Sequence, residues 1–193
     1  MMTESWRVFC AIELPPQVRA RVVDHVSHLR ASAPTARASW ARDEALHITL
    51  KFLGEIDSHH VRALSKAADN ATQNVQPFSV ALENTGTFPA HGAPRVLWIG
   101  ITDPSGNLAK LQQSLEGECA TEGFTREERT FHPHLTIARQ RAPQGARTPS
   151  VLQHDVPFAR VEFLVNELVV IRSELGHGGS RYTSLSRHIL RSG

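Results

Sequence analysis

The chain contains the same four-residue pattern twice, at residues 47–50 (HITL) and 134–137 (HLTI). Each copy reads histidine, aliphatic, threonine, aliphatic. An imidazole with a pKa near 6.5 can give or take a proton around neutral pH, and a threonine hydroxyl can donate a hydrogen bond to a phosphate oxygen. Two such histidines facing each other supply the acid and the base that cleave a phosphodiester. The repeat predicts a catalytic pair, His47 and His134.

The spacing within each copy indicates a half-buried β-strand. Residues two apart on a strand share a face and lie about 7 Å from one another. His47 and Thr49 therefore project together, as do His134 and Thr136, while the aliphatic residues project into a core. Two strands of this kind can line a cleft, in which Thr49 and Thr136 hold the phosphate.

Two other interpretations of these residues remain open. The first is that both pairs are ordinary strand residues, with threonine present for its β-propensity. The second is a zinc site, because His132 and His134 have a spacing that can chelate zinc, and His47 can add a third ligand. The zinc interpretation leaves both threonines unexplained, and the chain has no HExxH or CxxC pattern to support it.

The flanks of both patterns resemble a known family. Residues 45–55 (ALHITLKFLGE) and 131–139 (FHPHLTIAR) are similar to the two signatures of the 2H phosphoesterases, in the branch of RNA 2′,3′-cyclic phosphodiesterases, also called 2′-5′ RNA ligases. The similarity extends to residues 7–15, to residues 94–100 and, near the end, to Ser173, Gly179 and Tyr182. It therefore covers nearly the whole chain. Residues 126–130, which are unusually charged, and the loop at 140–143 depart from the family pattern without touching the motif residues.

This resemblance implies a fold and a reaction. The implied fold is α+β, with two pseudo-symmetric lobes, antiparallel-rich sheets flanked by helices, and the active-site cleft between the lobes. The implied reaction is the hydrolysis of RNA 2′,3′-cyclic phosphates to 2′-phosphomonoesters, with no metal or other cofactor. His47 would then be the proton donor and His134 the proton acceptor, with Thr49, Thr136 and Arg139 at the phosphate. Arginine is a natural bidentate donor to phosphate, although a salt bridge at the strand end also explains Arg139.

Composition limits the alternatives. At 193 residues the chain is long enough for a full core, and we expect residues 1–193 to form a single bilobal domain. No stretch reaches 18 apolar residues and no signal peptide is visible, so we expect a cytoplasmic monomer without membrane contact. A net charge of +2 argues against extensive electrostatic binding to nucleic-acid backbones and favours binding of a few nucleotides at an RNA end. Cys10 and Cys119 are expected to be core residues.

Hydrophobic periodicity predicts alternating strands and helices. The expected strands lie at 6–13, 45–53, 78–82, 95–101, 134–139, 157–164, 167–174 and 181–187. The first expected helix follows Pro15 and Pro16 and carries Val18, Val22, Val26 and Leu29. The second begins at an N-cap, Ser58, and the third starts at 103–105 and ends near Gly123. We expect loops around Gly86 and over residues 140–149.

Several functional alternatives also remain. The same two histidines could act on small cyclic nucleotides or on 2′,5′-linked oligonucleotides, with reversible ligation, or the chain could be a non-catalytic RNA-end binding protein. Trp40 and Tyr182 could each stack on a base or pack in the core. Histidines outside the two motifs, among them His59, His60 and His188, are expected at the surface.

Overall fold

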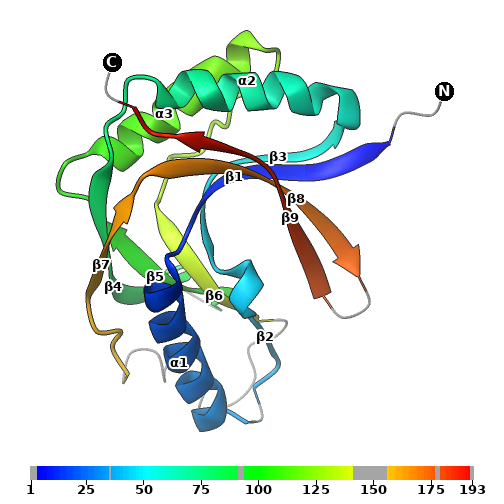
Figure 1. The fold of residues 1–193 in the computed structure, drawn as a ribbon. Helices are drawn as coiled ribbons and strands as arrows, with labels where there is room; N and C mark the ends of the chain where they lie inside the picture. The colour runs from blue at the N-terminus through cyan, green and yellow to red at the C-terminus, as the bar shows by residue number, and fades with distance from the viewer. Residues whose placement is uncertain (1–3, 35, 91–93, 141–155, 177–178, 192–193) are drawn as a thin grey trace.

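The computed structural model describes residues 4–34, 36–90, 94–140, 156–176 and 179–191. Helices and strands alternate along most of the chain (Figure 1). The strands are β1 (Ser5–Glu13), β2 (Ala38–Trp40), β3 (His47–Asp57), β4 (Phe78–Phe88), β5 (Val96–Thr102), β6 (His134–Gln140), β7 (Val161–Val165), β8 (Glu167–Gly176) and β9 (Gly179–Ile189). The α-helices are α1 (Pro16–Ser32), α2 (Val61–Thr72) and α3 (Asn107–Thr121), with 3₁₀ turns η1 (Asp43–Ala45) and η2 (Ser58–His60).

The described strands form two antiparallel sheets. Sheet A has the order β3-β1-β8-β9, and sheet B has the order β2-β6-β5-β4-β7. One motif strand lies in each sheet, β3 at the edge of sheet A and β6 inside sheet B. The expected α+β fold with antiparallel sheets and flanking helices is therefore confirmed.

The two sheets do not correspond to the two halves of the sequence. β8 and β9, from the end of the chain, complete the sheet that contains β1 and β3, whereas β2 and β4, from the first half, join the sheet that contains β6. Figure 1 shows the C-terminal β8 and β9 beside the N-terminal β1. The two motif-bearing sheets are thus interleaved in sequence, because each sheet is assembled from both halves of the chain.

The helices cover the faces of the sheets that point away from the cleft. α2 packs on α3 and on β8 and β9, α3 also contacts β3, and α1 approaches β7 (Figure 1). The apolar positions of α1 that share helical spacing are buried, and the helix begins with a proline at its first position, where no intrahelical N–H is needed. One core cluster joins both sheets and all three helices, with members such as Val8, Val22, Leu64, Leu111 and Leu135.

Some local predictions are wrong. Gly86 lies within β4, not in a loop, and its backbone packs directly against the ring of Trp98. The strand expected at 157–164 is shorter, because Phe158 turns into the core against the ring of His25 at 5.2 Å and β7 begins only at Val161. The loop expected at 140–149 lies, beyond Gln140, outside the described residues.

The helix starts also differ from the sequence-based expectation. Ser58 begins the 3₁₀ turn η2, and the residue before it, Asp57, accepts a hydrogen bond from the backbone N–H of His59. Asp103 accepts the backbone N–H of Leu108 at 2.7 Å, so residues 103–106 form a turn before α3. In both places a carboxylate ahead of the helix accepts a free backbone N–H, and the α-helix itself begins a few residues later than expected.

His188 was expected at the surface and is instead buried, with 6 % of its surface exposed. Its Nε2 lies 2.9 Å from Oγ of Ser186, and its Nδ1 lies 3.5 Å from a carboxylate oxygen of Asp69 on α2. The polar partners compensate for the burial of the ring.

Cys10 and Cys119 are buried free thiols, as expected. No helix in the described part of the chain is long and apolar enough to cross a membrane.

Candidate active site

The first motif strand, β3, turns His47 and Thr49 toward the cleft, and two bulges follow them. Thr49 pairs with Ala11 of β1, and Phe52 pairs with Phe9, while Leu50 and Leu53 are the extra residues that break the register. Because directly paired residues share a face, His47, Thr49 and Phe52 all lie on one face of sheet A. The same shifts bury Leu50 and Lys51 on the other face.

The second motif strand, β6, repeats this arrangement. Thr136 pairs with Trp98 of β5, Ala138 pairs with Leu97, and Ile137 is the extra residue. In an unbroken strand Arg139 would point away from Thr136, but the bulge after Thr136 returns Arg139 to the face of His134 and Thr136. Phe52 and Arg139 therefore occupy equivalent places, each five residues after its motif histidine.

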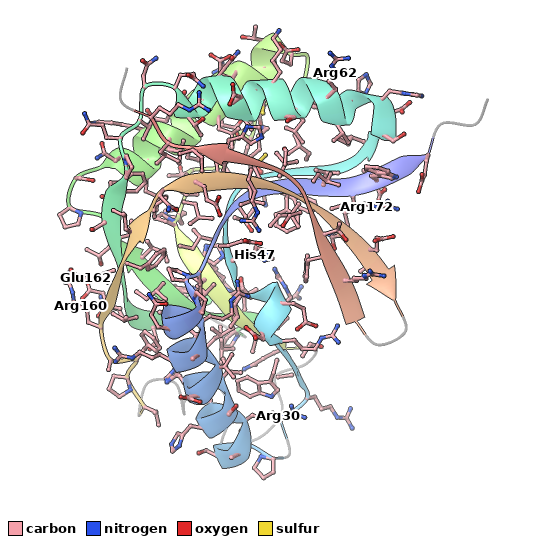
Figure 2. The ribbon with its side chains drawn as sticks, viewed as in Figure 1. Arg30, His47, Arg62, Arg160, Glu162 and Arg172 are labelled. Carbon is pink, nitrogen blue, oxygen red and sulfur yellow. The ribbon has the colours of Figure 1, made fainter. Side chains whose placement is uncertain are left out.

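A cavity of about 340 Å³ lies between the two sheets. Its lining includes all five predicted site residues, which are His47, Thr49, His134, Thr136 and Arg139. Trp40 and Tyr182 also line it, and both are only partly buried against apolar clusters, so the two interpretations of these rings are compatible. Figure 2 places His47 near the middle of the molecule, between the strands of the two sheets. The structure brings the predicted residues together, and their chemical roles remain predictions.

His134 is held by its own backbone. Its Nδ1 lies 2.7 Å from the carbonyl oxygen of His132, which can only accept a hydrogen bond. Nδ1 therefore carries the hydrogen, and in the neutral ring Nε2 has the free lone pair. The ring of Phe88 packs edge-on against His134 at 5.1 Å and limits its rotation. The arrangement suits a general base.

His47 lies in an aromatic environment. The ring of Phe9 is 4.6 Å from the imidazole, and the ring of Tyr182 meets it edge-on at 5.3 Å. Burial, the dominant cause, and the positive charge of Arg19 lower the pKa of His47 to about 4, and the carboxylate of Glu13 opposes this shift. The free protein therefore holds His47 mostly neutral at pH 7. A bound phosphate anion raises the pKa of a nearby imidazole again, since an opposite charge favours the protonated form.

The zinc interpretation finds little geometric support. The side chain of His132 is exposed and does not line the cavity, because β6 begins only at His134. Among the described residues no three histidine, cysteine, aspartate or glutamate side chains gather closely enough to hold a metal ion.

Sequence reasoning missed Arg42 at the cavity and Phe52 farther along the cleft face of β3. Phe52 is 49 % exposed on the cleft face of β3, with the guanidinium of Arg7 4.7 Å from the centre of its ring. Arg42 lines the cavity and donates to the carbonyl of Ser180, which ties the loop before β3 to β9. An exposed aromatic residue in a strand is a weak signal by itself, and Arg42 lies in a loop without periodicity, so neither residue stands out in the sequence.

Comparison with known proteins agrees with this geometry. A family model described as the 2′-5′ RNA ligase superfamily matches residues 14–177. The chain belongs to the 2′-5′ RNA ligase superfamily. Among relatives in this superfamily, the RNA 2′,3′-cyclic phosphodiesterase of Escherichia coli is 32 % identical, over 98 % of this chain and 99 % of that protein. The enzyme of the same name from Methanothermobacter thermautotrophicus is 31 % identical, over 93 % and 96 %.

Solved structures in the same superfamily share the fold. The crystal structure of TT0787 of Thermus thermophilus superposes with a TM-score of 0.81 at 30 % identity, covering 96 % of this chain and 98 % of that one. Escherichia coli LigT complexed with 3′-AMP superposes with a TM-score of 0.77 at 30 % identity, over 97 % and 99 %. The agreement extends over nearly the full length of the chain.

Proposed function

We propose that this member of the 2′-5′ RNA ligase superfamily hydrolyses RNA 2′,3′-cyclic phosphate ends to 2′-phosphomonoesters. The observation that carries the proposal is that two histidine-threonine pairs, from strands of different sheets, line one cavity. In-line displacement at phosphorus requires a base beside the attacking water and an acid on the opposite side, beside the leaving oxygen. Side chains on two facing sheets can provide that arrangement. The names of the relatives support the choice of substrate.

The proposed mechanism uses one proton transfer at each histidine. Nε2 of His134 takes a proton from water as the water oxygen bonds to phosphorus. The bond between phosphorus and the ribose 3′ oxygen breaks, and His47 gives its proton to that oxygen. The products are a 2′-phosphate and a free 3′ hydroxyl. No metal takes part in these steps, and each proton transfer contributes roughly 10² to 10⁴ in rate.

Thr49, Thr136 and Arg139 complete the site in this proposal. The two hydroxyls donate to the two non-bridging phosphate oxygens and hold phosphorus between the histidines. The Arg139 guanidinium, returned to the cleft face by the β6 bulge, binds the charge that builds on these oxygens in the transition state.

The size of the cavity supports recognition of an RNA end. A volume of about 340 Å³ is at the lower end of the range for small-ligand pockets and suits one nucleotide, not a duplex. A structural neighbour, Escherichia coli LigT, has been crystallised in complex with a nucleoside monophosphate, 3′-AMP. Because one chain supplies both histidine-threonine pairs, we propose that residues 1–193 act as a single bilobal domain and as a monomer. We also propose a cytoplasmic location, where RNA substrates occur.

Product analysis tests the proposal directly. An RNA oligonucleotide with a 2′,3′-cyclic phosphate end and a cyclic mononucleotide are incubated with the protein, and the products are separated against authentic 2′- and 3′-phosphates. We expect the 2′-phosphate from both, with the oligonucleotide preferred. A 3′-phosphate product would mean that His47 does not face the 3′ oxygen.

The remaining alternatives are distinct outcomes of the same assay. Preference for the mononucleotide would favour an enzyme of small cyclic nucleotides. Cleavage of 2′,5′-linked oligonucleotides, or their formation from a 5′-hydroxyl RNA, would add the reverse transesterification that the same acid and base can catalyse. Tight binding of the cyclic end without turnover would indicate an RNA-end binding protein.

A further inference from the structure

His47 lies between two cavities. One is the cavity that holds the motif residues, and the second is a smaller cavity of about 150 Å³ behind the imidazole, which we call the rear chamber. The polar lining of the rear chamber is Glu13, Arg19, Glu44 and Ser184. His47 and Tyr182 line both cavities, so these two rings form the partition between them.

The proposed reaction leaves both histidines in the wrong protonation state. After each turnover His47 has lost a proton to the 3′ oxygen and His134 has gained one from water. Before the next turnover His134 must release a proton, and a proton must reach His47. When the chemical step ends, the product phosphate still occupies the cavity that holds the motif residues. A proton that arrives through this cavity must therefore wait until the product is released. The rear chamber gives His47 a second opening, which Thr49, His134 and Thr136 do not line.

We propose that His47 regains its proton through the rear chamber, and that Glu13 is the positioning residue whose carboxylate favours the protonated imidazole. The inference rests on the proposed role of His47 as the acid. A small acid or hydronium ion enters the chamber, gives its proton to the imidazole, and leaves as the conjugate base. No bond between heavy atoms changes.

Glu13 is fixed in place for this role. It is the cross-strand partner of His47 in the β1–β3 pairing, so their Cβ atoms lie about 5 Å apart on the same face of sheet A. Its carboxylate accepts a hydrogen bond from Arg187 at 2.7 Å and one from Ser184 at 3.5 Å. Arg187 also donates to Glu167 at 2.5 Å. These hydrogen bonds hold the Glu13 carboxylate in place beside His47.

Arg19 of α1 supplies the opposing charge. It donates to the carbonyls of Asp43 at 2.7 Å and Leu14 at 3.4 Å, so its guanidinium is also held in place. The opposed effects of Arg19 and Glu13 on the pKa of His47 agree with this geometry.

Other titratable or charged groups also face His47 and its two cavities. Those that line one or both cavities are Arg42, Glu44, His134, Arg139 and Tyr182. Asp43 and Arg187 line neither cavity, but they pair with Arg19 and Glu13. Of these, Glu44 is paired with Arg42 at 3.4 Å. Glu13 is the carboxylate that both lines the rear chamber and is a strand partner of His47.

The first test is the pH profile of kcat/KM on a cyclic mononucleotide for Glu13→Gln. Because His47 is mostly neutral at pH 7, a further fall in its pKa lowers the protonated fraction in proportion. We expect kcat/KM at pH 7 to fall about threefold to tenfold, and the limb of the profile that belongs to His47 to move to lower pH. Arg19→Gln should move the same limb to higher pH, and Glu13→Asp should restore a profile close to wild type.

The matched control is Glu162→Gln. Glu162 is also paired with an arginine, Arg160, and its removal changes the net charge equally, but Figure 2 shows it far from His47. We expect a wild-type profile for this variant. Circular dichroism shows whether each variant is folded. A Glu13→Gln profile that coincides with the wild type, or a displacement of equal size in Glu162→Gln, would overturn the proposal.

The second test addresses the route. At constant pH and ionic strength, rising concentrations of acetate buffer should raise the kcat of Glu13→Gln about twofold or more and leave the wild type unchanged. The reason is that a small acid can protonate His47 when the Glu13 carboxylate is missing. A kcat of Glu13→Gln that is independent of buffer would overturn the route. His47→Ala is assayed in parallel: full activity in that variant would overturn the acid role itself, whereas an inactive His47→Ala with an unaffected Glu13→Gln would overturn only the present inference.

Discussion

The Nδ1 atom of His134 lies 2.7 Å from the carbonyl oxygen of His132, two residues earlier in the chain. The contact requires no side chain from another element. The tautomer of His134 is therefore fixed by the short segment 132–134 alone. The carbonyl accepts the Nδ1 hydrogen and leaves Nε2 as the acceptor. No described hydrogen bond of this kind restrains His47, which is instead held by the rings of Phe9 and Tyr182. The two histidines therefore have different environments, which agrees with different roles.

We expect His47→Ala and His134→Ala each to lower turnover of a 2′,3′-cyclic phosphate by roughly 10² to 10⁴. The double variant should be little worse than the poorer single variant, because the acid and the base act in one step. Steady-state kinetics on a cyclic mononucleotide measures this. Near wild-type turnover in either single variant would contradict the two-histidine mechanism. The matched control is His132→Ala, which removes an exposed ring and keeps the carbonyl that binds His134, and it should stay active.

Activity should survive exhaustive dialysis against EDTA. The proposed steps move protons between water, two imidazoles and the leaving oxygen, and none of them needs a Lewis acid. Turnover is measured before dialysis, after it, and after zinc or magnesium is added back. Loss of activity with recovery on adding zinc would revive the zinc interpretation and assign His132 to the site.

Arg139→Ala should lower kcat more than it raises KM, with a fall in kcat/KM of about 10² to 10³, because its proposed contact strengthens as charge builds on the phosphate oxygens. Arg139→Lys should recover only part of the loss, since lysine keeps the charge without the bidentate geometry. Arg62→Ala, on the outer face of α2, is the control for the loss of one positive charge (Figure 2). Equal effects of Arg139→Ala and Arg62→Ala would reduce Arg139 to a general electrostatic contribution.

His47 should make stability depend on pH. Folding lowers its pKa from 6.5 to about 4, so the unfolded chain binds more protons between these values. The contribution to the free energy of unfolding is fully present above pH 6.5 and is lost as the pH falls toward 4. Between pH 7 and pH 4 the wild type should therefore lose about 2 to 3 kcal/mol more than His47→Gln. Urea unfolding at both pH values measures the difference, with the exposed His59→Gln as the control. Parallel losses in wild type and His47→Gln would show that the ring is not desolvated.

Gly86→Ala should destabilise the protein by about 1 to 3 kcal/mol, because a new Cβ would overlap the ring of Trp98. The displacement should also reach the site, since Trp98 packs against Phe88 and Phe88 packs against His134. Gly117→Ala in α3 is the matched control: its Cβ meets nothing within 4 Å, and it should stabilise the helix by about 0.5 to 1 kcal/mol. Thermal and urea unfolding measure both effects. A neutral Gly86→Ala would mean that Trp98 can move aside without cost.

The sequence by itself was sufficient for the motif strands and for the class of fold. Alternation at 47–50 and 134–137 separates polar from aliphatic residues within four positions, and the spacing of Val18, Val22, Val26 and Leu29 identifies a buried helix face. These properties are local, because the side-chain directions of a strand or helix follow from its own backbone.

The tertiary structure alone decided which other side chains reach the site. Bulges after Thr49 and Thr136 return Phe52 and Arg139 to the cleft face, and strict alternation assigns both residues to the opposite face. The burial of His188, the interleaving of the two halves and the rear chamber behind His47 likewise depend on pairings between distant segments. The physical reason is that a bulge is set by the neighbouring strand, and a cavity by surfaces that meet only after the sheets have formed, so neither leaves a periodic signal in the chain.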